Sequence, residues 1–117
     1  MVCKMVDSKI KAMLETLVPP SSVARVFYKG KADTFITFQL VLGARSAFAD
    51  DAHEGMEYVY RMDIYSKTDY TALLKKAVAA LIALECYEML IDPETYENAT
   101  GYFHVPITFR IMEDLQQ

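Results

Sequence analysis

The chain has 117 residues, of which 53% are hydrophobic, and a formal net charge of −4. This length suits one domain over residues 1–117, which buries enough surface to fold without a disulfide or metal. The 16 acidic and 12 basic residues are scattered along the chain, which excludes the basic patch that nucleic-acid binding needs. Cys3 and Cys86 lack CxxC spacing and are expected to be free thiols. No apolar stretch approaches the roughly 20 residues of a membrane span.

A first helix is predicted over residues 2–18, where apolar side chains recur at helical spacing. Pro19 and Pro20 end it, because the residue before a proline avoids helical geometry. A strand over residues 23–28 and a hairpin connection over 29–33 lead to a second strand over 34–42. One face of that second strand is apolar: Ile36, Phe38, Leu40 and Leu42.

The stretch from Gly43 to Gly55 is predicted to be a long loop, rich in Ala and Asp, with a lone Phe48. Loops of about 12 residues or more are uncommon in compact domains and are often functional. We therefore expect this loop to reach a partner, with Phe48 as an anchor.

The second half begins with an alternating strand over residues 56–66, followed by a helix that Thr68 or Asp69 caps. A short strand over 86–91 and a polar turn over 94–101 precede a last strand over 102–111. Pro106 has no N–H to donate, so the last strand is expected to be an edge strand or to carry a bulge.

These elements predict an α+β domain in the order α-β-β-β-α-β-β. Short connections favour an antiparallel sheet of four to five strands, with both helices on one face. The other sheet face is expected to be partly solvent-exposed, suited to solvent or to a polar protein interface. It carries Thr37, Gln39, Glu57, Val59, Arg61, Asp63, Tyr65, Tyr102, His104 and Arg110.

No catalytic, cofactor or metal site is predicted. His53 and His104 have no zinc-binding spacing, and the acidic cluster around Asp50 and Asp51 is best explained as a solvated loop. Cys86 with His104 would make a nucleophilic pair only if the fold joined them. Cys86 is more simply a small buried hydrophobe, and an enzyme is not expected.

Four stretches together resemble the small tail completion proteins of long-tailed bacteriophages, also called tail terminator or head-tail joining proteins. They are YKGKADTFITF at residues 28–38, ADD at 49–51, YRMDIYS at 60–66, and ETYE at 94–97 followed by Thr100, Tyr102-Phe103-His104 and Phe109. The resemblance covers residues 23–111. Tyr65, where tryptophan is common, and Pro106 depart from the family pattern.

The resemblance implies a non-enzymatic phage or prophage protein without a cofactor. Such proteins form a homo-oligomeric, usually hexameric ring that caps the tail tube and meets the head connector. The implied partners are other copies, the tube protein and the connector protein, with no membrane or sequence-specific nucleic acid. The implied location is the head-proximal end of the virion tail, and the host cytoplasm during assembly.

The side chains expected to make these contacts are Arg45, Phe48, Asp50, Asp51, Tyr65, Tyr102, His104 and Arg110. Two alternatives remain open. One is a small cytosolic enzyme or ligand-binding module with an inter-subunit pocket near His104 and the acidic loop. The other is a cytosolic adaptor.

Overall fold

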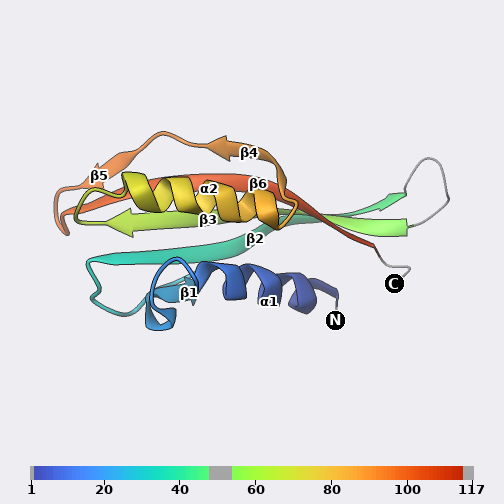
Figure 1. Cartoon of the computed structure of the whole chain (residues 1–117), viewed down its shortest axis with the longest axis horizontal. Coiled ribbons are helices and arrows are strands. Elements are labelled where there is room, and N and C mark those ends of the chain that lie inside the picture. Colours follow the sequence, from blue (N-terminus) through green and yellow to red (C-terminus); the bar gives the residue numbers. More distant parts are fainter. Residues whose placement is uncertain (1, 48–53, 115–117) are drawn as a thin grey trace.

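The computed structural model describes residues 2–47 and 54–114 (Figure 1). Six strands form one sheet in the order β1-β2-β3-β6-β4, and β5 pairs with β6. Two helices accompany the sheet, which confirms the α+β class. The elements are α1 (Val2–Leu14), a 3₁₀ helix (Pro20–Ser22), β1 (Val23–Arg25), β2 (Thr34–Ala47), β3 (Glu54–Ser66), α2 (Thr71–Ala83), β4 (Tyr87–Ile91), β5 (Thr95–Glu97) and β6 (Tyr102–Asp114).

Both helices pack on the same sheet face, as the single apolar stripe of each predicted. From α1 and α2, Ile10, Leu14 and Leu81 are completely buried against the sheet. Tyr60 on β3 and Phe109 on β6 lie at the centre of this core, with ring centroids 6.1 Å apart. Cys86 belongs to the same cluster, and burial raises the pKa of its thiol to about 11.

The helix ends differ from prediction at two places. The N-cap of α2 is Tyr70, which makes no side-chain cap hydrogen bond, so the prediction of Thr68 or Asp69 at that position is wrong. Asp69, one residue earlier, still accepts the Thr71 N–H with its carboxylate at 2.9 Å. The first helix ends at Leu14 rather than beside Pro19, and turns connect it to the 3₁₀ helix. Neither helix of the described residues is long and apolar enough to cross a membrane.

The predicted hairpin between the first two strands is wrong, because β1 runs parallel to β2. The chain from residue 26 to 33 returns from the end of β1 to the start of β2. Packing holds this return: the Tyr28 ring stacks on Phe35 at 4.1 Å, and its hydroxyl accepts the Ala32 N–H at 3.1 Å. A β-carbon at Gly30 would lie 2.2 Å from that hydroxyl, so any larger residue there would push the Tyr28 ring out of this position.

A strained turn ends β1. The Phe27 N–H donates to the Arg25 carbonyl at 2.8 Å across Val26, whose φ is +69°. This is a γ-turn of the rare, positive-φ kind, and a β-branched residue rarely adopts it. The turn leaves Val26 and Phe27 56% and 69% exposed.

We expect Val26→Gly to raise the free energy of unfolding by about 1 kcal/mol, since glycine adopts positive φ without strain. The matched control is Val41→Gly, which changes an equally exposed valine in β2 and should cost about 1 kcal/mol. Urea unfolding of both variants measures the difference. Equal destabilisation by the two substitutions would show that the Val26 turn is unstrained.

Most of the expected loop between Gly43 and Gly55 is strand instead. The ends of β2 and β3 (residues 41–47 and 54–59) pair as an antiparallel arm whose tip projects beyond both helices (Figure 1). The end of β6 pairs with the β3 strand of this arm as far as Gly55. Arg45 lies on β2 within this arm. The predicted contact residues Phe48, Asp50 and Asp51 lie outside the described residues.

A bulge in β2 overturns another expectation. The register shifts between Leu40, which pairs with Tyr60, and Leu42, which pairs with Val59. The extra residue moves Leu42 to the sheet face opposite Leu40 and leaves it 56% exposed. Alternation alone had placed both leucines on the core face.

β6 lies inside the sheet, between β3 and β4, so the expectation of an edge strand at Pro106 is wrong. The Pro106 carbonyl accepts the Asp92 N–H at 3.0 Å. In an antiparallel strand the backbone N and O of one residue point to the same side. The nitrogen of Pro106, which has no hydrogen to donate, therefore faces the β4 side, at the break between β4 and β5. The pairing of Pro106 with Asp63 on β3 is therefore undisturbed. The turn predicted over 94–101 also contains β5, in which Tyr96 pairs with Phe103.

Candidate functional site

The sheet face opposite the two helices, here called the open face, is the candidate functional site. No helix among the described residues covers it. It carries the polar side chains that alternate with the core residues of β2, β3 and β6. Tyr65, Tyr102, His104 and Arg110 of the predicted contact set belong to it, whereas Arg45 pairs with Met56 on the other face of the arm.

Four stacked rings, here called the aromatic ladder, cross one end of the open face. Tyr28, Phe35, Tyr65 and His104 lie with successive centroids 4.1, 4.6 and 4.2 Å apart and nearly parallel planes. The rings come from a loop and three strands, so the stack connects segments far apart in the sequence. Burial is the main cause that raises the pKa of the Tyr65 phenol, with a smaller contribution from the Asp63 carboxylate.

Tyr102 closes this end of the face. Its ring meets Phe35 edge-on at 5.2 Å, and its hydroxyl donates to the Ala32 carbonyl at 2.6 Å. The Lys67 ammonium lies 5.0 Å from the Tyr102 ring centroid, within cation–π range. Tyr65, Tyr102 and His104, predicted separately, are thus brought into one contact group.

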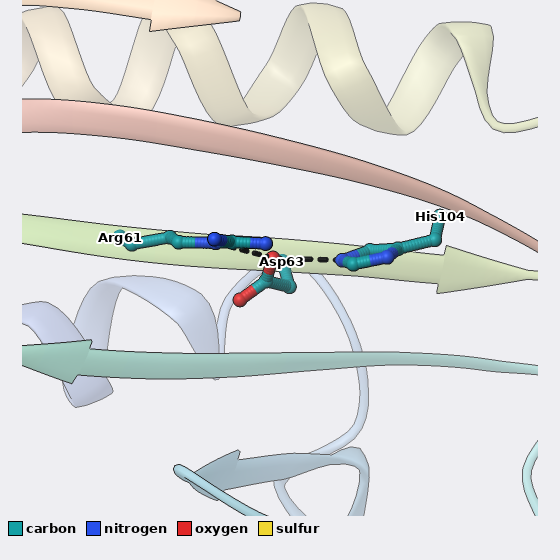
Figure 2. Close-up of polar contacts among 3 residues, drawn as sticks. All are labelled: Arg61, Asp63 and His104. Carbon is teal, nitrogen blue, oxygen red and sulfur yellow. Dashed lines mark hydrogen bonds and ion pairs between the residues drawn. The ribbon is translucent and has the colours of Figure 1, made fainter. Parts of the chain in front are cut away.

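Asp63 is the polar centre of the open face (Figure 2). Its side chain is only 10% exposed, and Oδ1 lies 2.9 Å from Arg61 Nε and 2.7 Å from His104 Nε2. Figure 2 shows Arg61 and His104 reaching the carboxylate from opposite directions. A carboxylate only accepts hydrogen bonds, so Nε2 of His104 carries the proton in its hydrogen bond with Asp63. Asp63 therefore fixes both the tautomer and the ring orientation of His104.

A second polar cluster lies toward the arm. Arg110 donates to Glu57 at 2.8 Å and pairs with Glu88 at 2.7 Å, and the Tyr87 hydroxyl donates to Glu57. Burial, then the bond to Glu57, raises the pKa of Tyr87 to about 12. Arg110 on β6 is thus held in place by carboxylates from two other strands, β3 and β4.

The open face offers little that resembles a reaction centre. The sheet separates Cys86, which lies in the core, from His104 on the open face, so the fold does not make this pair. Residues 2–47 and 54–114 include no group of three or more His, Cys, Asp or Glu placed to hold a metal ion. A groove of about 320 Å³ opens beside the aromatic ladder, lined by Phe27, Tyr28, Glu97, Thr100 and Tyr102 among others. The face presents stacked rings beside charged groups that are paired with one another.

Sequence reasoning missed the ladder itself and the network around Asp63. The alternation of β2 does place Phe35 on the open face, out of phase with Ile36. Ring stacking depends on which residues of neighbouring strands lie opposite each other, here Phe35 with Tyr65 and Tyr65 with His104. No spacing within one strand carries that information.

Comparison with known proteins identifies the fold only. No family model and no curated protein matches the sequence. Among solved structures, a chain of one described as the "Virion of native gene transfer agent (GTA) particle" superposes with a TM-score of 0.52. The match has 14% sequence identity and covers 93% of this chain and 91% of that chain. The chain therefore shares its fold, over nearly its whole length, with a chain of a gene transfer agent virion.

Proposed function

We propose that this chain is a structural protein of a phage or prophage particle, which caps the tail tube as an oligomeric ring and joins it to the head connector. The fold match carries the proposal, because it spans almost all of both chains and the matching chain comes from a virion. The sequence resemblance to tail completion proteins, seen independently in four stretches, points to the same class.

The open face supports an assembly role. Its tyrosines and arginines are residue types enriched in protein interfaces. The aromatic ladder and the Asp63 network hold these side chains rigid, so little side-chain entropy is lost on docking. The charged side chain at the centre of the face, Asp63, is already paired with Arg61 and His104.

The arm supports a role that bridges two partners. The described chain is 51 Å long but only 25 by 22 Å in cross-section, and the arm accounts for much of that length. An extended hairpin of this kind reaches past the body of its own subunit. In a ring it would meet the tube, the connector or the next subunit.

The test is native mass spectrometry and negative-stain electron microscopy of the full chain, alone and with a tail tube protein from the same genome. We expect hexameric rings, either free or formed on the tube ends. A compact dimer that binds or turns over a small molecule would contradict the proposal and favour the ligand-binding alternative.

A variant with a shortened hairpin tests the tip of the arm. Replacing residues 47–54 by Asn-Gly closes the hairpin directly after the Ser46–Gly55 pair with a favoured two-residue turn. We expect this shortened chain to keep its unfolding midpoint but to lose capping of the tube. Full capping activity in the shortened chain would remove the tip of the arm from the proposed mechanism.

A further inference from the structure

Exposed apolar side chains gather at the two opposite edges of the sheet. One edge, here the β1–β2 edge, consists of β1, β2 and the loop between them, and the other, the β4–β5 edge, consists of residues 85–97 (Figure 1). Among the side chains that the structure describes, seven of the eight large exposed hydrophobic ones lie on these edges; the eighth, Ile82, is on α2. They are Val26, Phe27, Val41 and Leu42 on the first edge, and Leu90, Ile91 and Tyr96 on the second.

The two edges carry opposite charge. Residues 23–47 contain four basic residues and one acidic residue, whereas residues 85–97 contain five acidic residues and no basic one. Lys29 and Lys31 are exposed on the first edge, and Glu85 and Glu94 are exposed on the second. The edges are therefore complementary to each other, while each would repel a copy of itself.

Both edges also present strand backbone. β1 pairs with β2 only from Ile36 to Phe38, so the rest of β2 has no strand on its outer side among the described residues. β4 is the last strand at the other end of the order. Open edges of this kind pair readily with another chain.

We propose that the β4–β5 edge of one copy docks against the β1–β2 edge of the next copy, head to tail. This inference rests on the proposed ring and names the surfaces that would meet in it. A contact between different edges is heterologous, and repeating it closes a ring when the rotation fits. A two-fold dimer would place the same edge of two copies together, and charges of the same sign would then repel each other. The strained turn at Val26 presents two apolar side chains on the edge where the neighbour's Leu90 and Ile91 would pack.

Two variants, each blocking one edge, test the proposal. The first combines Phe27→Glu with Lys29→Glu, and the second combines Glu85→Lys with Leu90→Lys; all four side chains are exposed in the single chain. We expect each variant to fold normally but to need about a hundredfold higher concentration to form rings, because like charges then meet across the contact. The matched control, Lys75→Glu with Lys76→Glu on α2, changes equally exposed lysines away from both edges and should form rings as the wild-type chain does.

Mixing the two variants gives the decisive measurement. Each retains one intact edge, and the two altered edges carry opposite charge, so native mass spectrometry of the mixture should show heterodimers and rings in which the two variants alternate, at concentrations where neither variant assembles alone. Rings that persist in each variant alone would overturn the edge contact and leave the proposed function standing. A wild-type chain that forms no ring, alone or on the tube, together with variants that form no heterodimer, would overturn both.

Discussion

Phe109→Ala is expected to lower the free energy of unfolding by about 3–5 kcal/mol. The Phe109 side chain is completely buried, stacks on Tyr60 and belongs to the core cluster that also contains residues of both helices. Truncation removes its apolar burial and leaves a cavity that rigid strands cannot close. Small domains have unfolding free energies of only about 5–15 kcal/mol, so this one substitution should remove a large part of the stability of the domain.

The matched control is Phe27→Ala, the same substitution at a side chain that is 69% exposed. It should change the unfolding free energy by no more than about 0.5 kcal/mol. Urea unfolding followed by circular dichroism measures both variants. If the two alanine variants proved equally stable, the core would not be centred on β6 and β3 as the structure has it.

Asp63→Ala is expected to cost about 2–3 kcal/mol, the second largest effect. The substitution leaves His104 and Arg61 without the oxygen that both donate to. We set the figure below that of a fully buried ion pair because the Arg61 side chain is 38% exposed and water replaces part of its interaction. Asp33→Ala, which removes an exposed carboxylate on the β1–β2 edge, should cost no more than about 0.5 kcal/mol.

A double-mutant cycle with His104→Ala isolates the contact itself. Residues in direct contact show coupling energies of about 0.5–3 kcal/mol, and we expect Asp63 and His104 to couple by at least about 1 kcal/mol. Additive losses would mean that the Asp63 carboxylate does not hold His104. The open face would then lack the rigidity on which the proposed docking role depends.

Where the hydrophobic pattern is local, the amino-acid sequence was enough to predict the elements and the faces they bury. The period of two in β3 and β6 placed Tyr60 and Phe109 in the core and Asp63 and His104 on the open face, as observed. The helical stripes predicted that both helices share one sheet face. Periodicity within a few residues carries this information, because burial of one face is what each element must achieve.

The way distant segments meet became visible only in the folded chain. The direction of β1 depends on Tyr28 stacking on Phe35, and the face of Leu42 depends on a bulge that the pattern of β2 does not reveal. Charges that look scattered along the chain become separated onto opposite edges once the strand order places β2 and β4 at the two sides. Register and strand order join residues tens of positions apart, and no short window of sequence specifies those pairings.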